Sequence, residues 1–124
     1  MNPIRLTLVD QPPRKGNGRR IVTGPGGKTR SIKSAKALAW VAAAWEQVPA
    51  SARQGVGSPT QPLAITFWVR YSSRLPDLSI ELILDTLQHV GVISDDRYVF
   101  EFHAFKEIDR ENPGVDILIE EAQL

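Results

Sequence analysis

Residues 62–72 constrain the fold more than any other part of this chain. The run reads Pro-Leu-Ala-Ile-Thr-Phe-Trp-Val-Arg-Tyr-Ser and is dominated by β-branched and aromatic residues, which fit a pleated, half-buried surface. The segment before it, residues 50–61, is rich in Gly, Ser and Pro, a composition typical of a surface loop. The sequence therefore predicts a strand over residues 62–72.

A first helix is predicted ahead of this strand, from about Ser34 to Val48. Alanine is plentiful there, Ser31 or Ser34 can cap the helix, and Pro49 ends it. One stripe of the helix carries apolar residues at helical spacing, and we expect it to face the core; it consists of Ala35, Leu38, Ala42, Trp45 and Val48. The three tryptophans are expected to pack rather than to stack on bases: Trp40, Trp45 and Trp68.

A second helix is predicted after the strand, from about Asp77 to Val90. Pro76 precedes it, Asp77 is a good N-cap residue, and Gly91 suits the left-handed position just past its end. The remaining periodic segments read as strands or as the two arms of a hairpin: residues 4–9, 19–22 with 29–31, 97–105 and 115–120. This order predicts an α+β fold, a single domain over residues 1–124 with two helices on one face of a mixed sheet.

Composition narrows the kinds of chemistry that are open to the chain. It has 124 residues and no cysteine, which excludes disulfides, zinc–thiolate sites and thiol nucleophiles. The longest apolar stretch, residues 37–45, is far short of the roughly 20 residues that a membrane span needs. The first residues do not read as a signal peptide. We therefore expect a cytoplasmic protein with no membrane partner.

Charge is divided unevenly along the chain. Residues 1–36 carry nine cations and one anion, Asp10, whereas residues 76–124 carry twelve anions and only three cations. A basic front beside an acidic back indicates either a polyanion-binding surface or two solvated surfaces that attract each other. The charge pattern alone leaves both interpretations open.

The predicted second helix contains an unusual acidic series. Asp77, Glu81 and Asp85 follow each other at intervals of four, and no Lys or Arg occurs between residues 75 and 96. Like charges four apart destabilise a helix by about 0.2–0.5 kcal/mol per pair. Asp95 and Asp96 follow in the next connection. A bound divalent cation would account for the clustering; a helix cap, a solvated face and a turn would also account for it.

Residues 74–87 and 91–99 resemble the signature region of RusA-type Holliday junction resolvases. They read Arg-Leu-Pro-Asp-Leu-Ser-Ile-Glu-Leu-Ile-Leu-Asp-Thr-Leu and Gly-Val-Ile-Ser-Asp-Asp-Arg-Tyr-Val. That family has an Asp-x-Asp-Asn stretch, a helix ending in Asp-Ala-Leu, and a Gly-(apolar)-x-x-Asp-Asp-x-x-Val segment. Asp85-Thr86-Leu87 and Asp95-Asp96 match without a gap.

The resemblance implies catalytic positions, and it also departs from the family pattern. Asp77 falls on the second Asp of Asp-x-Asp, and Asp96 falls on the last catalytic carboxylate. Three positions differ, because Leu75, Leu78 and Glu81 stand where the family has Asp, Asn and Lys. If the junction shifts by two residues, Asp77 matches the first Asp instead, and Ser79 the second. We hypothesise that Glu81 supplies the missing carboxylate; Asp85 is expected to be structural or to lie just outside the metal ligands.

The function that the resemblance implies is hydrolysis of phosphodiesters in branched DNA, at four-way junctions. Mg²⁺ or Mn²⁺ would be held by Asp77, Asp96 and Glu81, with Asp95 as a further ligand. The resemblance also implies a homodimer and a bacteriophage origin, and hence the cytoplasm of a bacterial host. The residues expected to contact phosphates are Arg14, Lys15, Arg19, Arg20, Lys28, Arg30 and Lys33. The alternative is a non-catalytic DNA- or protein-binding module with a decayed metal site.

Overall fold

A mixed sheet of four strands forms the body of the protein in the computed structural model, which describes residues 1–14, 19–23, 26 and 29–124. The strands are β1 (Ile4–Val9), β6 (Gly114–Glu121), β4 (Leu63–Tyr71) and β5 (Val99–Ile108), in that spatial order. β6 runs antiparallel to both β1 and β4, whereas β5 runs parallel to β4. The predicted α+β architecture is confirmed.

The strand predicted over residues 62–72 is the central element of the core. Every second side chain of β4 is buried, and the residues between them are half-buried. The buried set faces the helices and consists of Leu63, Ile65, Phe67, Val69 and Tyr71. Alternation with a period of two places these side chains on one face of the sheet, so the other face stays open.

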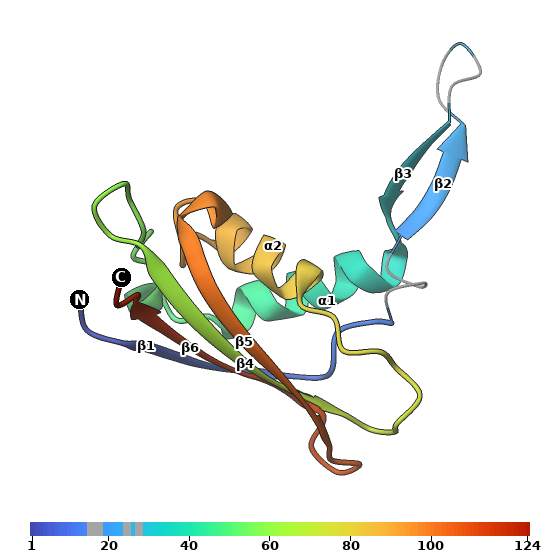
Figure 1. Ribbon diagram of the computed structural model, residues 1–124. Helices are drawn as coiled ribbons and strands as arrows, with labels where there is room; N and C mark the ends of the chain where they lie inside the picture. The colour runs from blue at the N-terminus through green and yellow to red at the C-terminus, as the bar shows by residue number, and fades with distance from the viewer. Residues whose placement is uncertain (15–18, 24–25, 27–28) are drawn as a thin grey trace.

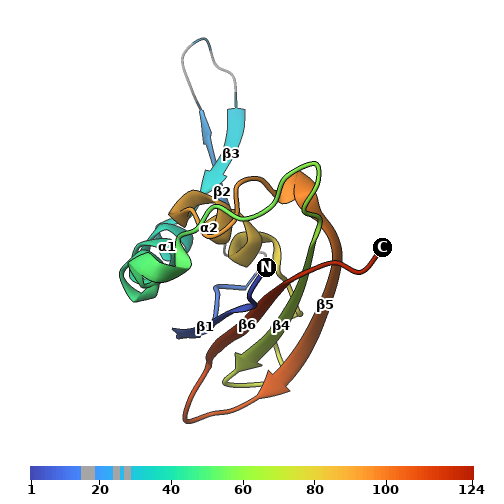
Figure 2. The same ribbon diagram turned by 90° about the vertical axis from the view of Figure 1, so that its left-hand side faces the viewer.

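Both helices pack on the same face of the sheet (Figures 1 and 2). They are α1 (Ala35–Gln47) and α2 (Glu81–Val90). Ser34 caps α1 as predicted, because its hydroxyl accepts a hydrogen bond from the backbone N–H of Ala37 at 3.2 Å. α2 connects the parallel strands β4 and β5, which no tight turn could join.

The predicted core stripe of α1 is wrong at Ala35, Leu38, Ala42 and Trp45, which are exposed, and is confirmed at Val48, which is buried. Leu38 is 53% exposed and Trp45 41% exposed, whereas Ala37, Trp40 and Ala44 are buried. The helix is rotated because Trp40 brings both bulk and a polar group to the core side. Its indole N–H donates to the carbonyl oxygen of Asp10 at 3.1 Å, and an indole buried without such a partner would be destabilising. Trp45 therefore packs outside the core, against the ring of His89 and beneath the Arg53 guanidinium.

A two-stranded arm extends away from the four-stranded sheet, beyond the start of α1 (Figure 1). β2 (Arg19–Thr23) pairs antiparallel with β3 (Thr29–Lys33), which confirms the predicted hairpin. Two short 3₁₀ turns, at Ala50–Ala52 and Asp96–Tyr98, complete the structure. The second turn occupies the predicted start of the strand at residue 97, so β5 begins only at Val99. No helix among the described residues is long and apolar enough to cross a membrane.

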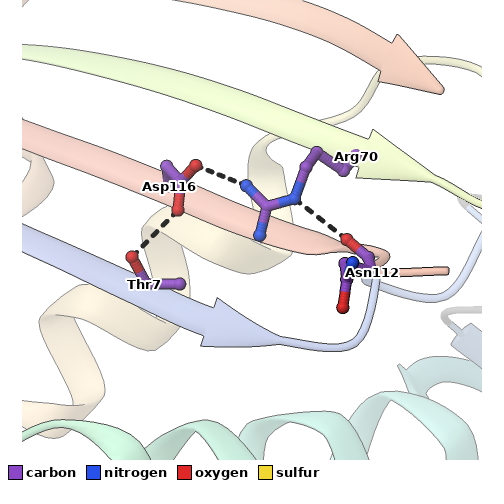
Figure 3. A network of polar contacts seen from close by, with 4 residues as sticks. All are labelled: Thr7, Arg70, Asn112 and Asp116. Atoms are coloured by element: carbon purple, nitrogen blue, oxygen red, sulfur yellow. Dashed lines mark hydrogen bonds and ion pairs between the residues drawn. The ribbon is translucent and has the colours of Figure 1, made fainter. Parts of the chain in front are cut away.

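A polar network ties three strands together on the open face of the sheet (Figure 3). The guanidinium of Arg70 forms an ion pair with Asp116 and donates from Nε to the carbonyl oxygen of Asn112 at 3.0 Å. Asp116 also accepts a hydrogen bond from the hydroxyl of Thr7 at 2.9 Å. The network fixes the β5–β6 turn against β4, and it leaves no room at Gly114 beneath it.

We expect Gly114→Ala to destabilise the fold strongly. A Cβ at this position would lie 2.4 Å from the carbonyl oxygen of Leu8 and 2.9 Å from the Arg70 guanidinium. Overpacking of this kind costs about 1–3 kcal/mol, and the backbone oxygen cannot move aside. Thermal unfolding measures the effect.

The matched control for this substitution is Gly55→Ala. A Cβ at Gly55 meets nothing within 4 Å, and only its φ of +60° opposes a side chain. An equal or smaller loss of melting temperature in Gly114→Ala than in Gly55→Ala would contradict the prediction.

Candidate functional site

The junction between β4 and α2 places Asp77 outside the helix. The hydroxyl of Tyr71 donates to the carbonyl oxygen of Asp77 at 3.1 Å and accepts from the backbone N–H of Ser79 at 3.3 Å. This bridge satisfies backbone groups that would otherwise enter a helix turn, and α2 begins only at Glu81. The predicted helix start and the N-cap role of Asp77 are therefore wrong. Asp77 and Glu81 do not share a helix face.

A polar hollow lies at the other end of α2. It is lined by Asp85, Gln88 and His89 from the helix and by Asp96 from the following turn, with a volume of about 460 Å³. Helical spacing places Asp85, Gln88 and His89 on one face. Gly91, with φ of +89°, ends the helix and turns the chain back. The Oε1 atom of Gln88 then accepts a hydrogen bond from the Asp96 backbone N–H at 3.0 Å, which holds Asp96 beside the helix.

Asp95 is engaged by its neighbour Arg97. One carboxylate oxygen accepts the Arg97 backbone N–H at 3.0 Å, and the other pairs with the Arg97 guanidinium at 2.9 Å. The pKa of Asp95 is lowered below its usual value. The hydrogen bond from the Arg97 backbone N–H is the largest cause, and the hydrogen bond from the Arg97 side chain is the next largest. Both oxygens thus stabilise the 3₁₀ turn at Asp96–Tyr98. Asp95 acts as the N-cap of this turn.

The carboxylates proposed as metal ligands do not assemble into one centre within the described part of the chain. No group of three or more His, Asp or Glu side chains there is placed to hold a metal ion. Glu81 begins α2, and Asp96 lies beside Gln88 near its end; seven residues of helix separate these points by about 10 Å. Asp77 lies four residues before Glu81. The arrangement therefore does not fit a Mg²⁺ or Mn²⁺ site built from Asp77, Glu81 and Asp96.

Three residues of the hollow were not predicted as functional: Asp85, Gln88 and His89. The sequence predicted Asp85 to be structural or to lie just outside the metal ligands. The signal that could have identified them is their spacing of three and four residues on one helix, followed by Asp96 after a glycine turn. Asp85 and His89 also line an apolar pocket beside the hollow, with Leu38, Val41 and Thr86.

The cations predicted to contact DNA are concentrated in the β2–β3 arm and the segment before it. Arg19 and Arg20 lie in β2, and Arg30 and Lys33 lie in β3. Arg14 is exposed in the segment that precedes the arm. Lys15 and Lys28 lie outside the described residues. In the register of the arm, Arg19 is directly opposite Lys33, and like charges in this relation destabilise a sheet.

No protein-family model matches this chain, and no curated protein matches it. The resemblance to RusA-type resolvases therefore depends on the residues of the signature region alone.

We expect Tyr71 to titrate above its usual pKa of 10.0 and to hold the β4–α2 junction. Burial raises the pKa of Tyr71, the Ser79 backbone N–H opposes this shift, and the charge of Asp77 adds to it. The folded-state pKa is raised, so its contribution to stability is complete below about pH 10 and is lost as the pH rises through the folded-state value. The chain has two tyrosines, so Tyr71 is the only one left in Tyr98→Phe. Absorbance titration of this variant measures the pKa of Tyr71.

Removal of the hydroxyl in Tyr71→Phe should cost about 1–2 kcal/mol, because two backbone groups lose their shared partner. The Tyr98→Phe protein is the control for loss of a phenol elsewhere. A titration midpoint at or below pH 10 for Tyr71, or equal stability of the two variants, would refute the role given to this hydroxyl.

Proposed function

We propose that this protein binds branched DNA through the β2–β3 arm. The observation that carries the proposal is the placement of Arg19, Arg20, Arg30 and Lys33 on a two-stranded ribbon that extends from the body (Figure 1). A two-stranded ribbon has the dimensions to enter the major groove of DNA.

The charge arrangement of the arm favours a polyanion as its ligand. Arg19 opposite Lys33 is unfavourable in the free protein. A phosphate near both residues would remove that repulsion, and release of counterions from DNA would add to the binding free energy. If the arm were only a solvated surface, no ligand would offset the repulsion between Arg19 and Lys33.

The body of the protein would confine the DNA to the arm. Twelve of the fourteen acidic residues lie between residues 76 and 124, which form α2, β5, β6 and their connections. Phosphates are repelled from that surface and attracted to the arm, so the contact is oriented as well as strengthened. The likeness of residues 74–99 to RusA-type resolvases supports a four-way junction as the DNA structure bound, in the cytoplasm of a bacterial host.

Cleavage of the junction is a second candidate function, and one observation favours it. Asp85 and Asp96 line the same hollow, and both match positions of the RusA-type signature. Although His89 also lines the hollow, no three His, Asp or Glu side chains among the described residues are placed to hold one metal ion. This weighs against cleavage, because metal-dependent nucleases hold their ions with several hard ligands. Our primary proposal is therefore binding without cleavage.

We expect the wild-type protein to bind a synthetic four-way junction with a marked salt dependence. Neutralising two arm positions in Arg19→Gln/Lys33→Gln should weaken binding and reduce the slope of log affinity against log salt by about two. The matched control is Arg74→Gln/Arg110→Gln, which removes two exposed cations from the body. Fluorescence anisotropy at several salt concentrations measures both. Equal slopes for the two double variants would refute the arm as the contact surface.

We also expect no metal-dependent cleavage of the bound junction. The assay is denaturing electrophoresis of labelled junction strands, with Mg²⁺, with Mn²⁺ and with neither. Asp96→Asn, Asp85→Asn and Glu81→Gln serve as the variants. Cuts that need the metal and disappear in Asp96→Asn would establish the second candidate instead, and unchanged cutting in Glu81→Gln would then exclude Glu81 as a ligand.

A further inference from the structure

The outer edge of β5 combines unpaired backbone with exposed apolar side chains. Within the described residues β5 pairs with β4 and with no other strand, and Figure 2 shows it at the edge of the sheet. Four large apolar side chains of the strand have high exposed fractions: Phe100 at 62%, Phe102 at 56%, Phe105 at 50% and Ile108 at 43%. Unpaired backbone groups beside such side chains form a template for another strand.

The free backbone groups of this edge belong to particular residues. The N–H of Asp109, just past the end of β5, donates to the carbonyl oxygen of Tyr71 in β4 at 2.9 Å. The register with β4 is regular from Glu101 onward. Because the N–H and C=O groups of successive residues point to opposite edges of a strand, the even-numbered residues direct theirs away from β4. These residues are Phe102, Ala104, Lys106 and Ile108.

β5 has few of the features that protect strand edges from pairing, which are bulges, prolines and lysines. It contains no proline, and its one register irregularity lies near its start, opposite Leu63 and Ala64. Its one lysine, Lys106, is turned toward the body. The ammonium group donates to the carbonyl oxygen of Arg74 at 2.8 Å and lies 5.9 Å from the centre of the Tyr71 ring. The charge of Lys106 is therefore held against the body rather than at the edge.

The charges that β5 carries on the open face of the sheet are acidic. Pairing with β4 places the odd-numbered residues of β5 on this face; they are Glu101, His103, Phe105 and Glu107. The ring of Phe105 stacks with that of Trp68, with 6.2 Å between the ring centres, and it lies between the two glutamates along the strand. An exposed aromatic ring near carboxylates attracts cations and repels phosphates.

Both glutamates keep their charge available for a ligand. Among the described residues, neither Glu101 nor Glu107 forms an ion pair with a lysine or an arginine. Glu101 contacts His103 at 2.7 Å. Arg70 is opposite Glu107 in the register, but its guanidinium is engaged by Asp116 and by the Asn112 carbonyl oxygen. The edge therefore offers negative charge on one face and apolar side chains on the other.

We propose that the β5 edge binds an extended segment of a partner protein in which basic and apolar side chains alternate. The segment adds a strand to the sheet, and hydrogen bonds to the outward backbone groups supply affinity. Its basic side chains lie on the open face, opposite Glu101 and Glu107. Its apolar side chains lie on the other face, beside Phe102 and Ile108. Cross-strand pairs of opposite charge and apolar cross-strand pairs both stabilise sheets.

The positions of the two glutamates define the spacing of the cations in the segment. Glu101 and Glu107 are six residues apart, which is about 20 Å along a strand. Both are equally far from Ala104, so basic residues six apart meet both carboxylates whichever way the segment runs. The proposal does not depend on DNA binding, because it involves β5 and not the β2–β3 arm.

A synthetic peptide tests the chemistry of the proposed partner. The probe has about ten residues, a long but ordinary strand length, and alternates lysine with valine. We expect it to bind the wild-type chain, as measured by fluorescence anisotropy of the labelled peptide. The control peptide has glutamate in place of lysine and should not bind. Equal binding of the two peptides, or no binding of the lysine peptide up to about 1 mM, would overturn the proposal.

Charge reversal tests the site on the protein. Glu101→Lys/Glu107→Lys should weaken binding of the lysine peptide by about tenfold or more, because two attractive cross-strand pairs become repulsive. The glutamate peptide should bind this variant instead. The matched control, Glu46→Lys/Glu121→Lys, reverses two exposed glutamates outside β5 and should have the smaller effect. Equal losses in the two double variants would place the peptide on the acidic body at large and would overturn the assignment to β5.

A proline at the edge tests whether the peptide adds as a strand. Ala104→Pro removes an outward N–H that β4 does not use, a change that edge strands tolerate, and it should abolish peptide binding. Ala104→Ser keeps the N–H and should bind as the wild type does. Unchanged melting temperature and unchanged four-way junction binding of Ala104→Pro would show that the variant is folded and that the arm acts separately.

Methylated peptides give a second test of strand addition that leaves the protein unchanged. One peptide carries N-methyl groups on its valine amides only, and the other carries them on its lysine amides only. Alternate N–H groups of an added strand face β5, so one peptide should lose binding and the other should keep it. Equal affinities of the two would overturn strand addition. Self-association of the wild-type chain that Ala104→Pro abolishes, without any peptide binding, would overturn the proposed partner.

Discussion

Burial of one face of β4 is the interaction on which the other parts of the structure depend. The alternate side chains from Leu63 to Tyr71 are at most 1% exposed, and they form the surface on which α1 and α2 pack. β5 and β6 hydrogen-bond to β4 on either side, so both are positioned by it. The apolar area removed from water here drives folding, and the positions of α2 and of the hollow beside it follow from it.

The last buried residue of β4 also decides where the acidic residues lie. Tyr71 ends the apolar series with a hydroxyl, which binds the backbone of Asp77 and Ser79 instead of a neighbouring side chain. The chain therefore stays outside a helix until Glu81, and the acidic series is divided between the two ends of α2. The division is the physical reason why the described residues contain no three-ligand metal centre, and it is the basis for preferring binding over cleavage.

The sequence predicted the element order and the sheet class well, because those depend on local periodicity. The β4 alternation, the Ser34 cap and the Gly91 helix end all follow from rules that act within a few residues. The rotation of α1 about its axis was not predictable in this way. The helix carries two apolar stripes, and only the hydrogen bond from Trp40 to Asp10 determines which stripe faces the core. The start of α2 depended on Tyr71, six residues away from Asp77, and the site depended on Gln88 holding Asp96. Such side-chain-to-backbone contacts leave no periodic pattern in a sequence.

The turn at Asp96–Tyr98 joins the hollow beside α2 directly to the first residue of β5. Asp96 lines the hollow and Val99 begins the edge strand, so only Arg97 and Tyr98 separate a candidate ligand site from β5. A molecule held at Asp96 and any contact made by β5 would act on the same short piece of backbone. Thermodynamic linkage then makes any influence between the two contacts mutual. If one contact changes the affinity of the other by some factor, the second changes the affinity of the first by the same factor.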